Sequence, residues 1–276
     1  MKRIATMQDI SCVGKCSLTV ALPVISAMGI EAAVIPTAVL STHTMFQNFT
    51  FHDLTDEIDP IISHWKKEGF SFEALYTGYL GSLRQLDLAS KLFDAFPTQF
   101  KLVDPCMADN GKMYVGFPEE FPAEMAKLCA KADIICPNLT EASFLLGIPY
   151  VGDNYDEAYV RDVLKKLTDL GTKTAILTGI SLNKNCLGAY AYDSGNDTYY
   201  YYETKEEIQH FHGTGDLWAS TFLGAMVNGR SLDDALRIAC EFVRESIRLT
   251  LAEENHNTYG VNFEQAIPYL SYLINA

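Results

Sequence analysis

The sequence of 276 residues lacks the two glycine-rich motifs that most often indicate nucleotide binding. It contains no G-x-x-x-x-G-K-[ST] segment, which excludes a P-loop enzyme. After the first apolar segment Gly14 stands alone, without the G-x-G-x-x-G pattern of dinucleotide-binding dehydrogenases. A nucleotide, if bound, must therefore be recognised through another arrangement of backbone groups.

Positive charge is scarce as well. The 21 Lys and Arg residues face 35 Asp and Glu residues, for a formal net charge of −14. This charge makes nucleic acid and anionic membranes poor partners, so a polyanion would have to be held by backbone amides and a metal ion. No apolar run reaches about 18 residues, and Met1-Lys2-Arg3 leads into only a short apolar segment, so neither a membrane span nor a signal peptide is expected. The seven cysteines form no C-x-x-C pair and indicate reduced thiols in a cytoplasmic protein.

Segments typical of strands and of helices alternate along the chain, which predicts one domain spanning residues 1–276. The expected architecture is a three-layer α/β/α fold with a mostly parallel sheet covered by helices on both faces. Strands are predicted at 3–7, 32–40, 74–80, 100–103, 133–136 and 173–178, and a β-hairpin at 187–192 and 198–203. Helices are predicted at 18–28, 82–96, 119–130, 140–146, 155–170, 217–227, 232–251 and 263–274. The four tyrosines Tyr199–Tyr202 are expected to form a strand with one packed face.

Polar residues follow the predicted parallel strands where ligands bind in open α/β sheets, beyond the carboxyl ends. The residues Asp104, Asp109, Asn138 and Glu141 supply hard oxygen atoms, which suit Mg²⁺. The alternative is turn chemistry, because Asp-Pro and Pro-Asn are good turn formers. Because both the Asp-Pro and the Pro-Asn pair stand at successive strand ends, with the Gly213–Asp216 segment downstream, a functional site is favoured over turn chemistry. His43 and Tyr79 are candidates for packing against a planar substrate, or are ordinary structural residues.

The segment Gly213-Thr214-Gly215-Asp216 precedes an apolar helix. Glycines at a helix start let backbone N–H groups converge on an anion, and the helix dipole adds positive potential. An aspartate there repels a static anion, but it suits a phosphoryl group in transit if the carboxylate accepts a proton from the attacking hydroxyl. The alternative is an ordinary helix start with Asp216 in the cap or the first turn.

These motifs together resemble the ribokinase superfamily and, within it, the vitamin B6 (pyridoxal/pyridoxamine) kinases. The matching segments, in the family's order, are 8–14, Ser41-Thr-His-Thr44, Thr77-Gly-Tyr-Leu-Gly-Ser82, Asp104-Pro-Cys-Met-Ala-Asp109, Pro137-Asn-Leu-Thr-Glu141 and Gly213–Asp216. The Gly-Thr-Gly-Asp segment is shared by the whole superfamily, whereas Thr-His-Thr and Thr-Gly-Tyr-Leu-Gly-Ser point to the B6 branch.

The resemblance implies ATP-dependent phosphorylation of the 5′-hydroxymethyl group of a B6 vitamer. It makes Asp216 the general base, with Gly213, Thr214 and Gly215 as the anion hole. It assigns Asp104 and Glu141 to Mg²⁺. The nucleotide would contact the anion hole and four further residues, which are Asp109, Tyr114, Asn138 and Thr178.

For the pyridine ring the resemblance implies contacts from Asp9, His43, Thr44 and Tyr79. Asp9 departs from the family pattern, in which many members have Ser at this position. A carboxylate there favours a cationic amine or a protonated ring nitrogen, which directs the expectation towards pyridoxamine or pyridoxine. The resemblance also implies a homodimer and leaves a monovalent cation as an open requirement. The alternatives are a hydroxymethylpyrimidine kinase of the same fold and a non-catalytic ligand-binding protein.

Overall fold

The computed structural model describes residues 1–209 and 211–276. Its centre is a nine-stranded sheet whose middle strands are parallel, while strands at both edges run antiparallel. In spatial order the strands are β11 (Thr198–Lys205), β10 (Cys186–Asp193), β9 (Thr174–Ile180), β8 (Ile134–Ile135), β5 (Phe100–Val103), β4 (Ala74–Thr77), β1 (Arg3–Ser11), β2 (Glu31–Leu40) and β3 (Phe51–Asp53). A separate two-stranded sheet pairs β6 (Ala108–Asp109) with β7 (Lys112–Met113).

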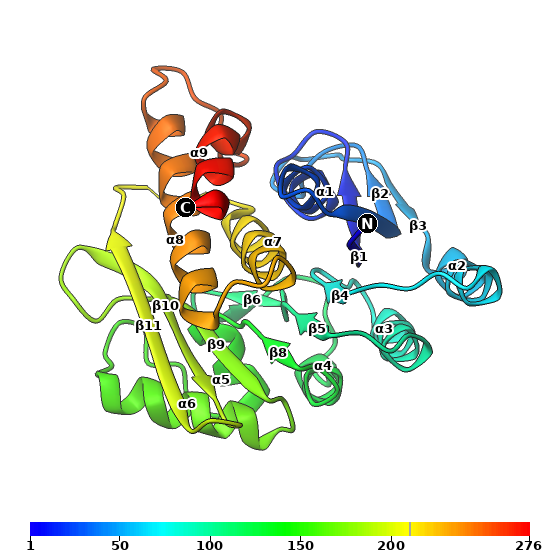
Figure 1. The fold of residues 1–276 in the computed structure, drawn as a ribbon, viewed down its shortest axis with the longest axis horizontal. Helices are drawn as coiled ribbons and strands as arrows, with labels where there is room; N and C mark the ends of the chain where they lie inside the picture. The colour runs from blue at the N-terminus through cyan, green and yellow to red at the C-terminus, as the bar shows by residue number, and fades with distance from the viewer. Residues whose placement is uncertain (210) are drawn as a thin grey trace.

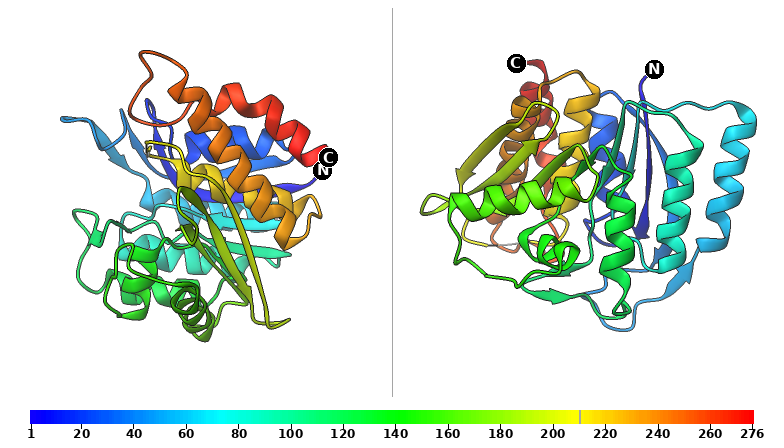
Figure 2. Two further views of the ribbon diagram at one scale, coloured as in Figure 1. Left: turned by 90° about the vertical axis from the view of Figure 1, so that its left-hand side faces the viewer. Right: turned by 90° about the horizontal axis from the view of Figure 1, so that it is seen from below.

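Helices cover both faces of the sheet, which confirms the predicted three-layer architecture (Figure 1). One face carries α1 (Leu18–Ala27), α7 (Thr214–Val227), α8 (Leu232–Leu251) and α9 (Phe263–Asn275). The other face carries α2 (Thr55–Glu68), α3 (Leu83–Ala95), α4 (Phe121–Cys129), α5 (Leu139–Leu146) and α6 (Glu157–Asp169). Each helix layer encloses its own apolar core against the sheet, and the left view of Figure 2 shows the layers edge-on.

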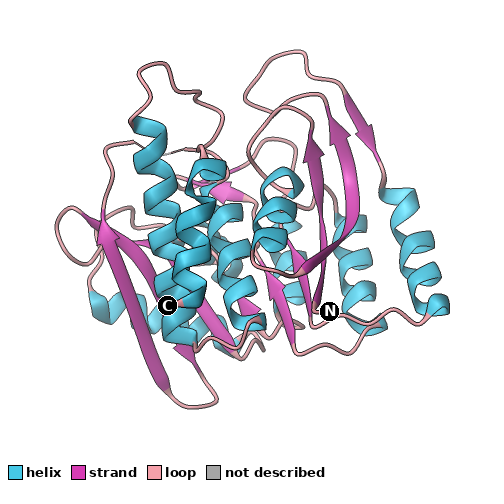
Figure 3. Cartoon of the chain, turned by 45° about the horizontal axis from the view of Figure 1, so that its top comes forward, coloured by secondary structure: helices cyan, strands magenta, loops and turns pink. Residues whose placement is uncertain are grey.

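α7 is unlike the other helices because it is buried on almost all sides. Its residues from Asp216 to Ala225 are buried, and the helix packs between α1 and α8 (Figure 3). A helix that is apolar all round is stable only inside a protein. The burial fixes the position of the first turn of α7, which contains most of the Gly213–Asp216 motif.

Several predicted boundaries were wrong. β1 continues to Ser11 instead of ending at Met7, so Gln8 and Asp9 lie within the strand and not after it. α7 begins at Thr214 rather than at Leu217. β4 ends at Thr77, three residues before the predicted end. The strand β3, the helix α2 and the β6–β7 hairpin were not predicted.

The predicted β10–β11 hairpin is confirmed, but both faces of its tyrosine strand are packed. Tyr199 and Tyr201 pack on the core beside α6, whereas Tyr200 and Tyr202 pack on the core beside α8. Alternating side chains of a strand point to opposite faces, so a strand between two helix layers needs aromatic residues on both. In the part of the chain that the structure describes, no helix is long and apolar enough to cross a membrane.

Candidate active site

The first turn of α7 meets the carboxyl ends of the parallel strands. Gly213 is the N-cap and has φ 74° and ψ 2°, in the left-handed region. A Cβ atom at Gly213 would lie 1.8 Å from the backbone oxygen of Lys15, so both the dihedral angles and the packing require glycine. The first four N–H groups of a helix have no partner within the helix, and here they belong to Gly213, Thr214, Gly215 and Asp216.

Asp216 stands in this first turn and is only 9 % exposed. Burial raises the pKa of its carboxyl group to about 7, and the negative charge of Asp9 acts in the same direction. A hydrogen bond from the backbone N–H of Ser17 partly opposes the increase. A carboxylate with a pKa near the working pH is well suited to accept a proton and release it again.

Asp104 follows β5 directly and is also buried. Its pKa is well above the ordinary value, first because of burial and second because of the charge of Asp216. A Cβ atom at Gly215 would lie 3.9 Å from Asp104 Oδ2. The structure therefore places Asp104 beside the first turn of α7.

Glu141 belongs to a capping box at the start of α5. The Asn138 side chain accepts a hydrogen bond from the Glu141 N–H (2.9 Å), and Glu141 Oε2 accepts one from the Asn138 N–H (2.9 Å). Its Oε1 atom accepts a hydrogen bond from the Met107 N–H at 3.1 Å. Burial raises the pKa of Glu141, and repulsion from Asp104 adds to the effect. Asn138 and Glu141 thus cap the start of α5, and the capping box places a second carboxylate near Asp104.

Asp104 and Glu141 fit a hydrated Mg²⁺ ion. Repulsion from Asp104 raises the pKa of Glu141, and a cation between the two carboxylates would relieve that repulsion. Within residues 1–209 and 211–276 no group of three or more His, Cys, Asp or Glu side chains is arranged to hold a metal. Mg²⁺ commonly keeps several waters and takes only one or two carboxylates together with substrate phosphates, so two carboxylates suffice.

The β6–β7 hairpin contains Asp109 and leads into Tyr114, the two residues that the resemblance assigns to the nucleotide. The Asp109 side chain accepts hydrogen bonds from Asn110, and the Tyr114 N–H donates to the Met107 carbonyl at 2.9 Å. Asn138 Nδ2 ties the hairpin to α5 through the Ala108 carbonyl at 3.0 Å. The hairpin is thus attached to the same capping segment that contains Glu141.

Thr178 was predicted at a strand end and lies inside β9, where it forms a bridge with Asn138. The Thr178 N–H donates to the Pro137 carbonyl at 3.0 Å. Thr178 therefore lies beside the capping box of Asn138 and Glu141, towards the carboxyl ends of the parallel strands.

Asp9 lies at an irregularity in the pairing of β1 with β2. Gln8 pairs with Pro36 but Ile10 pairs with Val39, so two residues of β2 oppose Asp9. Such bulges redirect side chains near active sites. The Asp9 carboxylate is buried and accepts a hydrogen bond from Ser17 Oγ at 2.6 Å. Burial raises its pKa, and the Ser17 hydroxyl opposes that increase.

Two aromatic side chains stand near Asp9 or the α7 turn. Burial raises the pKa of Tyr79 to about 12 with a second contribution from the Asp9 charge, and the Tyr79 ring packs on Phe117 at 5.7 Å. The ring of His43 lies 4.7 Å from that of His212, directly before Gly213. Burial, then the nearby His212, lowers the pKa of His43 to about 4, so its ring is neutral at neutral pH. Thr44, by contrast, is exposed.

Sequence reasoning missed the roles of His212 and Ser17 in this neighbourhood. His212 directly precedes the glycine motif, which was the available signal. Ser17 offered none, because its contacts depend on an unusual backbone conformation with φ 49° and ψ −131°.

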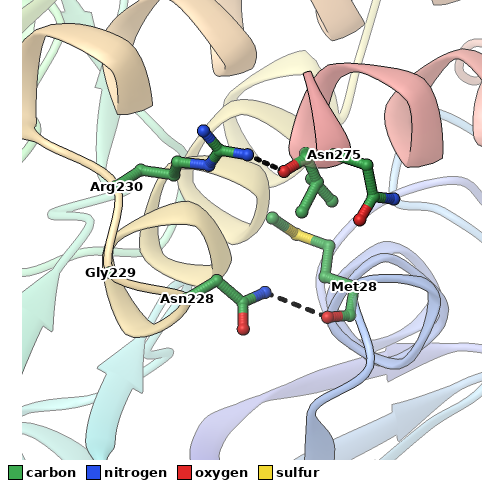
Figure 4. Close-up of a pocket in the computed structure, with 6 residues that line it drawn as sticks. Met28, Asn228, Gly229, Arg230 and Asn275 are labelled. Carbon is green, nitrogen blue, oxygen red and sulfur yellow. Dashed lines mark hydrogen bonds between the residues drawn. The ribbon is translucent and has the colours of Figure 1, made fainter.

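A hollow in the structure lies away from these residues. It has a volume of about 440 Å³ and is lined by Met28, Asn228, Gly229, Arg230, Ile274 and Asn275 (Figure 4). Asn228 Nδ2 donates to the Met28 carbonyl at 3.0 Å, and Arg230 donates to the Ile274 carbonyl. This hollow lies at the carboxyl end of α7, about 20 Å from Gly213 at 1.5 Å per helical residue. None of the candidate site residues lines it.

The model of the phosphomethylpyrimidine kinase family matches residues 19–262. The chain belongs to this kinase family. A crystal structure from Bacteroides thetaiotaomicron, provisionally described as a phosphomethylpyrimidine kinase and obtained with pyridoxal, is 38% identical to this kinase. The alignment covers 98% of this chain and 96% of that one, with a TM-score of 0.92.

Two further relatives resemble this kinase along nearly its whole length. Pyridoxal kinase from Lactobacillus plantarum is 27% identical, with a TM-score of 0.91 and coverage of 99% of this chain and 98% of that chain. Pyridoxal kinase PdxY from Histophilus somni is 26% identical over 100% of this chain and 96% of its own length. This kinase is therefore a ribokinase-like phosphotransferase that acts on an alcohol group, as its sequence predicted.

Proposed function

We propose that this kinase transfers the γ-phosphoryl group of ATP to the 5′-hydroxymethyl group of a vitamin B6 vitamer. The observation that carries the proposal is the buried carboxylate of Asp216 in the first turn of α7, next to unpartnered backbone N–H groups. The similarity to pyridoxal kinases and to a relative crystallised with pyridoxal supports the choice of acceptor.

In this proposal Asp216 accepts the proton of the substrate hydroxyl as its oxygen attacks the γ-phosphorus. The N–H groups of Gly213, Thr214 and Gly215 bind the oxygens of the transferring group, where negative charge is concentrated. Because the α7 turn is fixed by burial, these donors need little reorganisation during the reaction. A carboxyl group with a pKa of about 7 holds the proton weakly enough to release it after transfer.

Asp104 and Glu141 would hold Mg²⁺, which neutralises charge on the phosphates when it is bound. Asn138 fixes the orientation of Glu141 through the capping box. Asp109, Tyr114 and Thr178 are proposed to line the nucleotide site together with the α7 turn. The hairpin that contains Asp109 would cover the phosphates.

The vitamer is proposed to lie against Asp9, His43, Thr44 and Tyr79. The carboxylate of Asp9 favours a protonated ring nitrogen or a cationic amine, so pyridoxamine and pyridoxine are the expected substrates. The neutral imidazole of His43 accepts a hydrogen bond from the Met45 N–H at Nδ1 (3.1 Å), which leaves Nε2 as the donor. A ring hydroxyl is a suitable acceptor for that donor.

A substrate panel tests the proposal. ADP formation should be measured with pyridoxal, pyridoxamine, pyridoxine and hydroxymethylpyrimidine, each with and without Mg²⁺. The proposal expects Mg²⁺-dependent ADP formation with at least one B6 vitamer. Preference for hydroxymethylpyrimidine would replace the substrate but keep the chemistry. Vitamer binding without ADP formation at any Mg²⁺ concentration would indicate a binding protein instead.

Three further expectations accompany this proposal. Residues 1–276 act as one kinase domain, and the family match over 19–262 supports that extent. The resemblance to B6 kinases supports a homodimer, which analytical ultracentrifugation would test. It also supports a cytoplasmic location, and a titration with K⁺ would test the role of a monovalent cation.

A further inference from the structure

Ser17 adopts a backbone conformation that glycine normally occupies. Its φ of 49° and ψ of −131° correspond to the first central position of a type II′ turn. A side chain in this region strains the backbone, and such strain persists where the surroundings impose it, often at functional sites. Ser17 is also buried, so solvent does not explain the presence of a hydroxyl group there.

Three groups of Ser17 bind three different parts of the site. Its Oγ donates to Asp9 Oδ1 at 2.6 Å. Its backbone N–H hydrogen-bonds the Asp216 carboxylate. Its carbonyl accepts from the N–H groups of Val20 and Ala21 at 3.0 and 2.8 Å and so begins α1. The residue thus connects β1, α1 and the first turn of α7.

The neighbours of Ser17 hold this segment in place. The Lys15 carbonyl faces Gly213 so closely that a Cβ atom there would lie 1.8 Å away. Lys15 Nζ is bound to Asn262 at 3.0 Å and to Glu264 at 2.7 Å. Residues 15–17 are therefore fixed between the α7 turn and the start of α9, which explains how the strained conformation is maintained.

Ser17 does not cap α1 with its side chain, although it occupies the N-cap position. Serine is common at N-caps because its Oγ accepts a backbone N–H of the first turn. Here the hydroxyl is directed to Asp9 instead. The Oδ2 atom of Asp9 has a weaker contact, with Ser11 Oγ at 3.5 Å. The Ser17 hydroxyl is thus the principal group that orients the Asp9 carboxylate.

From this arrangement we infer that Ser17 is a positioning residue that sets the orientation of Asp9 for the vitamer and ties it to the segment that binds Asp216. The inference rests on the proposed function, because it assigns Asp9 to the acceptor. The hydroxyl fixes which lone pairs of Asp9 face the substrate, while the backbone N–H keeps Asp216 in place independently of the side chain. Loss of the hydroxyl alone should therefore weaken acceptor binding and spare the base.

The variant Ser17→Gly separates these contributions, because glycine tolerates the backbone conformation and retains the N–H and the carbonyl. We expect the KM for the vitamer to rise about 10-fold or more, as for loss of a hydrogen bond to a charged group. The kcat should stay within about threefold and the KM for ATP should not change, because Asp216 and the α7 turn keep their contacts. Ser17→Ala should raise the KM similarly but melt at a lower temperature than Ser17→Gly, because alanine retains the strain.

Two comparisons test whether Ser17 changes the vitamer KM through Asp9. In an Asp9→Asn background, Ser17→Gly should change the vitamer KM by less than about twofold, because residues that act through one another are not additive. Ser231 is a matched control, since it caps α8 through its hydroxyl in the ordinary way, and Ser231→Gly should leave both KM values unchanged. A vitamer KM that is unaltered in Ser17→Gly, or an undiminished effect in the Asp9→Asn background, would overturn the inference.

The same experiment distinguishes this inference from the proposed function. A wild-type enzyme that phosphorylates a vitamer while Ser17→Gly keeps its vitamer KM overturns the inference alone. A wild-type enzyme that phosphorylates no vitamer overturns the proposed function and this inference together.

Discussion

Replacing Asp216 by Asn should stabilise the folded kinase at alkaline pH. In the folded protein burial raises the Asp216 pKa from 3.8 to about 7. Between these two values the folded state binds a proton that the unfolded chain has released, so stability falls as the pH rises through this range. The loss is complete above about pH 7 and amounts to about 4 kcal/mol, since one pKa unit corresponds to about 1.4 kcal/mol. Asparagine does not ionise and escapes the penalty.

The free energy of unfolding should be measured in urea for both proteins at about pH 5 and about pH 8. The advantage of the variant over the wild type should grow by about 2.5 kcal/mol between these conditions. Asp233→Asn is the matched control for the change of a carboxyl group to an amide, because Asp233 stands exposed in the first turn of α8. An Asp216→Asn advantage that is the same at both pH values would refute the reasoning that burial perturbs this carboxyl group.

Three further substitutions test the geometry of the site. Gly213→Ala should cost more than about 2 kcal/mol of stability, because the methyl group meets the Lys15 carbonyl. Its control is Gly229→Ala, which is also at positive φ but has nothing within 4 Å and should cost about 1 kcal/mol. Urea unfolding of the two variants measures both costs. Gly215→Ala should fold normally, since alanine favours helices. Its kcat should fall at least about tenfold, because the methyl group projects towards Asp104. A kcat equal to that of the wild type would contradict an anion hole at this turn. Glu141→Gln should lower the unfolding free energy by about 1–3 kcal/mol, because the two N–H groups of Asn138 and Met107 bind different oxygens of Glu141 and one of these becomes an NH2 group, which cannot accept. A stability equal to that of the wild type would argue against the capping box.

The layered fold and the main strands could be predicted from the sequence because their signals are local. The helices predicted at 232–251 and 140–146 agree closely with α8 (Leu232–Leu251) and α5 (Leu139–Leu146). The extension of β1 to Ser11 was missed because polar Gln8 and Asp9 resemble the end of a strand. They remain in the strand because β2 and the loop before α1 enclose them. Burial of polar groups by distant segments leaves no local signal.

In the candidate site, too, general rules of the fold could be applied to the sequence, whereas features that depend on contacts between distant segments could not be predicted. The proximity of Asp104, Glu141 and Asp216 followed from a simple rule, that parallel strands end at one edge of a sheet. The double role of Glu141 in capping α5 and facing Asp104 depends on its exact placement on the helix. The orientation of Asp9 depends on a bulge and on the unusual dihedral angles of Ser17, neither of which a residue pattern predicts.

The role of Asp216 as the general base is the central claim, and the rate of phosphoryl transfer in Asp216→Asn tests it most directly. With saturating vitamer, ATP and Mg²⁺ at neutral pH, kcat should fall by about two to four orders of magnitude, while the dissociation constants of vitamer and ATP stay close to those of the wild type. A variant that retains the wild-type kcat would contradict the account.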